Sequence, residues 1–110
     1  MMPASERQLS KCIKANYGNW ALVHLPSGQW GAIWRASLGV EDMCEAILNG
    51  TWFHAANPSF SSRAGALEGI VKGIEREIQN ERSPSNKETF KSFLQRARNA
   101  LSRQLTAEKR

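Results

Sequence analysis

Apolar residues recur every three or four positions in four segments of the chain, which is the spacing of amphipathic helices. The pattern predicts a first helix in "SERQLSKCIKANYG", which Ser5 can cap and Gly18 can close. A second is predicted in "GVEDMCEAILNG", with acidic residues in its first turn. A third should begin near Ser62, and a fourth should open with Ser83-Pro84 or with the capping box Ser85-x-x-Glu88. The expected apolar faces are Leu9, Cys12 and Ile13; Val40, Met43, Cys44, Ile47 and Leu48; Leu67, Ile70, Val71, Ile74 and Ile78; and Phe90, Phe93, Leu94, Ala97, Leu101 and Leu105.

The stretch "WALVHLPSGQWGAIWRA", residues 20–36, has a different pattern. Pro26 and Gly28 suit a tight turn, so the stretch predicts a β-hairpin with the loop Pro26-Ser27-Gly28. Alternation along the strands then places one set of residues on a single face: Trp20, Leu22, His24, Trp30, Ala32 and Trp34. We interpret this tryptophan face as core, because large aromatic residues bury much area and no basic residue alternates with them.

"TWFHA", residues 51–55, predicts a further strand, which gives the element order α-β-β-α-β-α-α. The expected fold is therefore α+β, with a small two- to three-stranded, mostly antiparallel sheet packed with about four helices. A chain of 110 residues is close to the commonest domain size, so residues 1–110 should form a single compact domain. Residues 106–110 are expected to be a frayed tail.

The second face of the hairpin is also apolar, although a sheet covered on one side only should be polar on the other. It would carry Ala21, Val23, Leu25, Ile33 and Arg35. Either helices cover both sides of the sheet, or this face meets another chain. On the second alternative Val23, Ile33 and Arg35 would contact a partner.

The third helix contains glycine at every fourth position, as Gly65, Gly69 and Gly73. An interior glycine costs a helix about 0.5–1 kcal/mol relative to alanine, so three in register need a reason. They lie on the side opposite the apolar face, where they would let another backbone approach closely. The neighbour could belong to the same chain, to a partner, or to a second copy in a symmetric dimer. Lys72 and Arg76 on the same helix belong to this expected contact surface.

The net charge of +5 is concentrated at the C-terminal end. Residues 82–110 hold eight basic and two acidic side chains, a net +6. Lys91, Arg96, Arg98 and Arg103 flank both sides of the last helix's apolar face and do not form one stripe. Such residues are usually solvated and snorkel beside apolar surface. The alternative is contact with phosphates or with an acidic partner.

No motif in the sequence indicates catalysis, a cofactor or a metal site. Cys12, Cys44, His24 and His54 lack the spacing of zinc ligands, and no glycine-rich loop lies between a strand and a helix. We expect a protein that is not an enzyme and has no cofactor. The two cysteines fit reduced thiols, and no apolar run is long enough for a membrane span, so we expect a cytoplasmic protein without membrane contact.

The combination of a tryptophan-rich hairpin, "WFHAANPSF" leading into "SSRAGALEGIVKGI", and no active-site motif resembles small accessory proteins of phages and mobile elements, including anti-CRISPR proteins. The resemblance implies an inhibitor or modulator that blocks a surface of a protein, alone or within a nucleoprotein complex. Many such inhibitors are acidic, whereas this chain has a pI near 9.7, which disfavours mimicry of nucleic acid. The alternative is a small basic nucleic-acid-binding or regulatory protein that uses the C-terminal helix.

Overall fold

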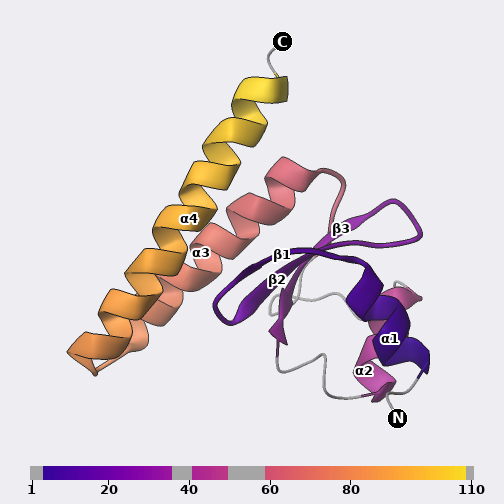
Figure 1. Cartoon of the computed structure of the whole chain (residues 1–110), viewed down its shortest axis with the longest axis horizontal. Helices are drawn as coiled ribbons and strands as arrows, with labels where there is room; N and C mark the ends of the chain where they lie inside the picture. Colours follow the sequence, from indigo (N-terminus) through magenta and orange to yellow (C-terminus); the bar gives the residue numbers. More distant parts are fainter. Residues whose placement is uncertain (1–3, 36–40, 50–58, 109–110) are drawn as a thin grey trace.

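A computed structural model describes residues 4–35, 41–49 and 59–108 of the chain (Figure 1). Within these ranges it contains four helices and four strands. In chain order they are α1 (Ala4–Lys11), β1 (Ile13–Tyr17), β2 (Trp20–His24), β3 (Trp30–Trp34), α2 (Glu41–Leu48), β4 (Ser59–Phe60), α3 (Arg63–Asn80) and α4 (Pro84–Glu108). The α+β class predicted from the sequence is confirmed. The helix α4 continues to Glu108 and so includes residues 106–108 of the expected tail, whereas residues 109–110 lie outside the described residues.

The sheet is antiparallel throughout, with strand order β1-β2-β3-β4. The predicted hairpin is confirmed with its register: Trp20 pairs with Trp34, Leu22 with Ala32, and His24 with Trp30. Leu25 donates its backbone N–H to the Gln29 carbonyl at 2.8 Å, which closes the loop of residues 26–28. Gly28 has a φ of 92°, a left-handed conformation that glycine adopts without strain.

The first strand was not predicted. The helix expected over residues 5–18 ends at Lys11, and residues 13–17 pair with β2 instead. Ile13, Ala15 and Tyr17 alternate with Lys14 and Asn16, a strand period that competed with the helical one. Pairing with β2 decides the competition, because the outer edge of β2 would otherwise lack backbone partners. The strand predicted at residues 51–55 lies outside the described residues, whereas β4 pairs with Trp30 and Gly31.

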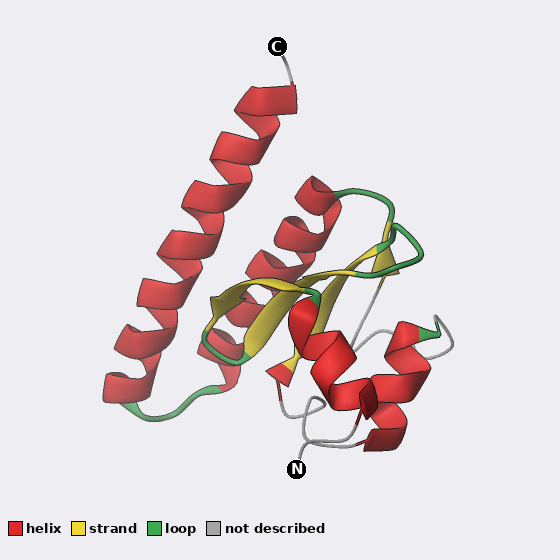
Figure 2. Cartoon of the chain, turned by 45° about the vertical axis from the view of Figure 1, so that its right-hand side comes forward, coloured by secondary structure: helices red, strands yellow, loops and turns green. Residues whose placement is uncertain are grey.

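Helices cover both faces of the sheet, in three layers (Figure 2). The helices α3 and α4 pack on the tryptophan face, where Trp20, Leu22 and Ala32 are buried. The pair α1 and α2 covers the reverse face with Leu9, Cys12, Cys44 and Ile47. We call the first group the aromatic layer and the second the aliphatic layer.

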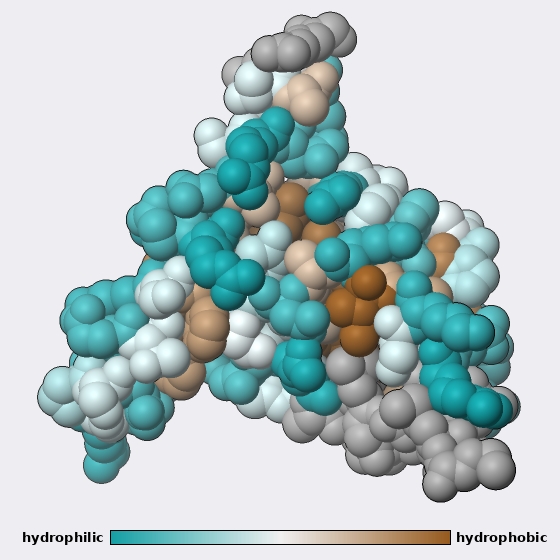
Figure 3. Space-filling view, in the orientation of Figure 1, coloured by the Kyte–Doolittle hydropathy of each residue, from teal (hydrophilic) through white to brown (hydrophobic). Residues whose placement is uncertain are grey.

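The aliphatic layer corrects one expectation. Val23 and Ile33 are 0% exposed, beneath α1 and α2, so they are core residues and cannot contact a partner in this fold. Of the two alternatives for this face, coverage by the chain's own helices is the correct one. The face of the molecule seen in Figure 3 is hydrophilic over most of its coloured area, with small, separated hydrophobic patches.

Candidate functional site

Aromatic rings from other parts of the chain pack directly against the glycines of α3. Ser62 caps the helix by accepting the Gly65 backbone N–H at 3.1 Å. A Cβ on Gly69 would lie 2.6 Å from Cζ of Phe60, and one on Gly73 would lie 2.5 Å from Cζ2 of Trp20. The groups that approach these glycines closely are therefore aromatic side chains of the same chain, and not another backbone as expected from the spacing.

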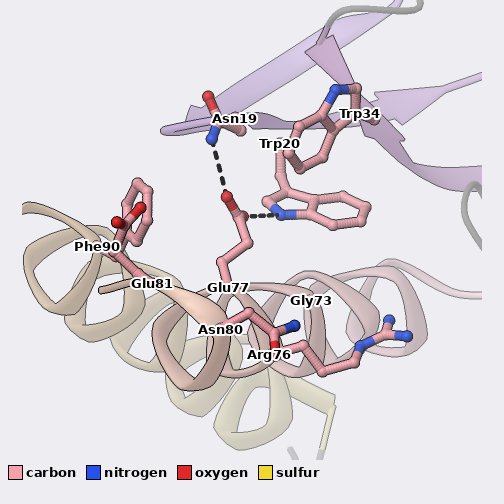
Figure 4. A pocket seen from close by; sticks show the side chains of 9 residues that line it. All are labelled: Asn19, Trp20, Trp34, Gly73, Arg76, Glu77, Asn80, Glu81 and Phe90. Carbon is pink, nitrogen blue, oxygen red and sulfur yellow. Dashed lines mark hydrogen bonds between the residues drawn. The ribbon is translucent and has the colours of Figure 1, made fainter. Parts of the chain in front are cut away.

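Two hollows lie along this side of α3, and Arg76 borders both. The larger, which we call the tryptophan hollow, has a volume of about 560 Å³. It is lined by Asn19, Trp20, Trp34, Gly73, Arg76, Glu77, Asn80, Glu81 and Phe90 (Figure 4). The smaller, the glycine hollow, measures about 330 Å³ and is lined by Phe60, Gly65, Glu68, Gly69, Lys72 and Arg76.

Glu77 organises the centre of the tryptophan hollow. One of its carboxylate oxygens accepts the Trp20 indole N–H at 2.6 Å, and the other accepts the Asn19 side-chain amide at 2.8 Å (Figure 4). These bonds satisfy a buried donor that would otherwise cost about 1–3 kcal/mol. The Trp34 ring meets Trp20 edge to face, with centroids 5.4 Å apart. Asn19 lies in the turn between β1 and β2. Its backbone carbonyl accepts the backbone N–H of Arg35 at 2.8 Å, which holds this turn against the end of β3.

A second carboxylate, Glu81, lies at the end of α3 beside Phe90 (Figure 4). One of its oxygens accepts the backbone N–H groups of Ser83 and Arg82, each at 3.0 Å. The hydrogen bond from Ser83 is the main cause that lowers the pKa of Glu81 below its ordinary value. This carboxylate is therefore ionised at neutral pH, and it ties α3 to the start of α4.

The C-terminal end of α3 carries an unfavourable charge arrangement. Glu75, Glu77 and Glu81 crowd the end where the helix dipole favours cations, and its last turn contains no basic residue. Glu75 is paired with Arg98 of α4 at 3.1 Å. Within the described ranges, neither Glu77 nor Glu81 forms an ion pair. The tryptophan hollow thus contains two carboxylates that are hydrogen-bonded by neutral groups only.

Five residues of the predicted contact surface border the two hollows: Gly65, Gly69, Lys72, Gly73 and Arg76. Arg35 lies elsewhere, donating a hydrogen bond to the side chain of Asn16 on β1. The spacing of the glycines therefore indicated the side of α3 on which the two hollows lie. It did not identify Trp34, Glu77 or Phe90, because only the fold brings the end of β3 and the start of α4 to this helix.

Three of the four basic residues singled out on the C-terminal helix contact the chain itself. Lys91 pairs with Glu88 at 3.3 Å, and Arg98 pairs with Glu75. The guanidinium of Arg96 lies 5.6 Å from the centroid of Tyr17 and covers its ring. The side chain of Arg103 is exposed, and no hydrogen bond or ion pair joins that side chain to another described residue.

The other candidate groups have structural surroundings. His24 stacks on Trp30 with centroids 4.0 Å apart, and Arg63 lies 5.6 Å from the same ring. Cys12 and Cys44 are free thiols buried in the aliphatic layer, where burial raises the pKa of Cys12. His54 lies outside the described residues. Among residues 4–35, 41–49 and 59–108, no group of three or more His, Cys, Asp or Glu side chains could hold a metal ion.

No helix in the described ranges combines the length and the apolar character that crossing a bilayer requires. In comparisons with known proteins, no family model, no curated protein and no solved structure matched this chain.

Proposed function

We propose that this protein is a small non-enzymatic modulator that binds another protein through the side of α3 that carries the two hollows. The tryptophan hollow is the observation that carries the proposal, because its ring surface, backbone turn and charged groups converge on one concave region. Contact there would occupy a surface of the partner. The resemblance to phage and mobile-element accessory proteins favours an inhibitor of the anti-CRISPR kind within this class.

Two features favour a protein over a nucleic acid as the partner. The carboxylates of Glu77 and Glu81 would repel phosphates at the tryptophan hollow. On α4, Lys91 and Arg98 already have acidic partners within the chain. Binding of nucleic acid through α4 is the alternative, and it would use exposed basic residues such as Arg103, which forms no ion pair with another described residue.

Affinity capture tests the proposal by comparing a variant at the tryptophan hollow with a variant on the exposed face of α4. We expect tagged protein to retain one protein partner in fixed stoichiometry after nuclease treatment. Asn80→Arg, which places a long side chain at the rim of the tryptophan hollow, should reduce capture at least tenfold. Arg103→Glu on the exposed face of α4 is the matched control and should leave capture unchanged.

Two results would overturn the assignment. If nuclease removed the bound material and Arg103→Glu abolished binding, α4 would be a nucleic-acid site. If the partner were retained equally by Asn80→Arg and the wild type, the contact surface would lie away from α3. Circular dichroism of each variant confirms that both are folded.

A further inference from the structure

We propose that the tryptophan hollow receives an arginine side chain of the partner, whose guanidinium binds between Glu77, Glu81 and the neighbouring aromatic rings. The inference rests on the proposed function, since it specifies what part of a protein partner this surface recognises. Three observations favour a cationic ligand. They are the ion pairing of the two carboxylates, their position at the C-terminal end of α3, and the aromatic rings around them.

The first observation is that Glu77 forms no ion pair with another described residue, whereas Glu81 has the charge of Lys87 nearby. Glu77 is half buried, and each of its oxygens already accepts one hydrogen bond from a neutral donor. A carboxylate oxygen can accept a second bond, so lone pairs are available to a ligand. Charge-assisted hydrogen bonds to a guanidinium are about twice as strong as those to neutral donors.

The second observation concerns the helix. Glu77 and Glu81 are four residues apart, a spacing at which like charges repel by about 0.2–0.5 kcal/mol. Both lie at the negative end of the α3 dipole, which opposes them further. A bound cation would relieve both effects at once, whereas an anionic ligand would add to them.

The third observation is the ring surface. Phe90 is half buried, so part of its ring is open to a ligand, while Trp20 is almost fully buried and meets Trp34 edge to face. Cations bind over such rings, and the planar guanidinium of arginine stacks on them as well. The methylene groups of the arginine stem would cover apolar ring surface at the same time.

The chain's own cation at this site does not replace the proposed ligand. Arg76 extends from α3 on the opposite side of Glu77 from Phe90 and Glu81 (Figure 4). It forms no ion pair with either carboxylate. Glu77 therefore has no ion-pair partner among the described residues, although the chain as a whole carries +5.

The test uses N-acetyl-arginine N-methylamide as the probe and the full chain as the receptor, followed by two-dimensional NMR. The indole N–H of Trp20 is a direct reporter, because it donates to Glu77. We expect saturable shifts of this resonance, with dissociation constants in the millimolar range typical of a single side chain. The citrulline analogue has nearly the same shape but no charge, and it should bind at least fivefold more weakly.

The variant Glu77→Gln separates charge from packing. Glutamine keeps an acceptor for the Trp20 indole N–H, and the Asn19 amide can turn to accept from the new amide group. The fold should persist while arginine binding weakens at least fivefold. Glu88→Gln removes an equal charge from α4, outside the lining of both hollows, and should bind the probe as the wild type does.

Absence of saturable shifts, equal binding of the citrulline analogue, or unchanged binding by Glu77→Gln would each overturn the arginine assignment. These failures differ from failure of the proposed function. A partner captured equally by the wild type and Glu77→Gln, but lost in Asn80→Arg, would leave protein binding through α3 intact and remove only the arginine. Probe binding without any captured partner would remove the modulator function.

Discussion

The two layers that pack on the sheet differ in the types of side chain they contain. The aliphatic layer consists of small and medium side chains, among them Leu9, Val23, Ile33 and Ile47, all 0% exposed. The aromatic layer contains three tryptophans and several phenylalanines, many of them only half buried, around the glycines of α3. The described side chains of the aliphatic layer are mostly buried, whereas the aromatic layer borders a hollow that is lined by aromatic, polar and charged side chains.

This difference separates stability from recognition within a small domain. Aliphatic side chains fill space without polar atoms, so the aliphatic layer needs no partner. Large rings seated against glycines leave edges that neighbouring side chains do not fill, and polar groups gather at those edges. The pairing of Glu77 with the Trp20 indole N–H is one result. We therefore expect substitutions in the aliphatic layer to change only stability, and those that line the tryptophan hollow to change binding.

The largest expected effect comes from truncating the two faces of the same hairpin. Leu22→Ala in the aromatic layer and Ile33→Ala in the aliphatic layer should each lower the free energy of unfolding by about 2–5 kcal/mol, since both side chains are fully buried. Urea denaturation measures both, and Leu105→Ala at the exposed end of α4 is the control, within about 0.5 kcal/mol of wild type. A loss below 1 kcal/mol for Ile33→Ala would mean that the aliphatic layer contributes little to folding.

An intermediate effect is expected from two glycines of the same helix. Gly73→Ala should destabilise the protein by about 1–3 kcal/mol, because its Cβ would lie 2.5 Å from the buried, rigid ring of Trp20. A Cβ on Gly65 would lie 3.3 Å from both Cδ1 of Phe60 and the capping Oγ of Ser62, contacts that small shifts of a half-buried ring and a hydroxyl can relieve. Gly65→Ala should leave stability unchanged or raise it by up to about 1 kcal/mol through helix propensity. Thermal unfolding compares the two, and equal midpoints would contradict the ring-in-glycine packing.

The smallest expected effect is the pH dependence contributed by Glu81. Its pKa is lowered in the folded chain from 4.5, chiefly by the hydrogen bond from Ser83, so its contribution to stability is present above that value. The contribution is lost as the pH falls through the lowered pKa. Glu81→Gln should therefore lose less stability than the wild type between pH 6 and pH 3, as measured by urea midpoints. Parallel pH profiles would show that this carboxylate does not stabilise the junction of α3 and α4.

Much of the fold could be predicted because local patterns and long-range packing agree there. The hairpin register followed from Pro26 and Gly28 together with strand alternation, and pairing across β2 and β3 confirms it. The strand β1 was missed because residues 12–17 satisfy both a helical and a strand period. Only the unpaired edge of β2, which is not visible in the local sequence, decides between them.

The candidate site could be predicted in part. The glycine spacing indicated the side of α3 that borders the two hollows, and Lys72 and Arg76 line the glycine hollow as well. Val23 and Ile33 were assigned to a partner because their apolar character was visible, whereas the helices that cover them were not yet placed. Glu77 carried no local signal, since an acidic residue on an amphipathic helix normally faces solvent. Its role depends on Trp20, which lies 57 residues away in the sequence.

The three glycines of α3 also bear on the order in which the protein folds. Each lowers the intrinsic helix propensity by about 1 kcal/mol relative to alanine, so an isolated peptide of residues 63–80 would be largely unstructured in water. The helix α4 has 25 residues and no glycine, and it is the better candidate for early, local helix formation. We expect α3 to become helical only as Phe60 and Trp20 dock against it. Both hollows are therefore late products of folding, and no fragment centred on α3 should reproduce what the intact chain binds.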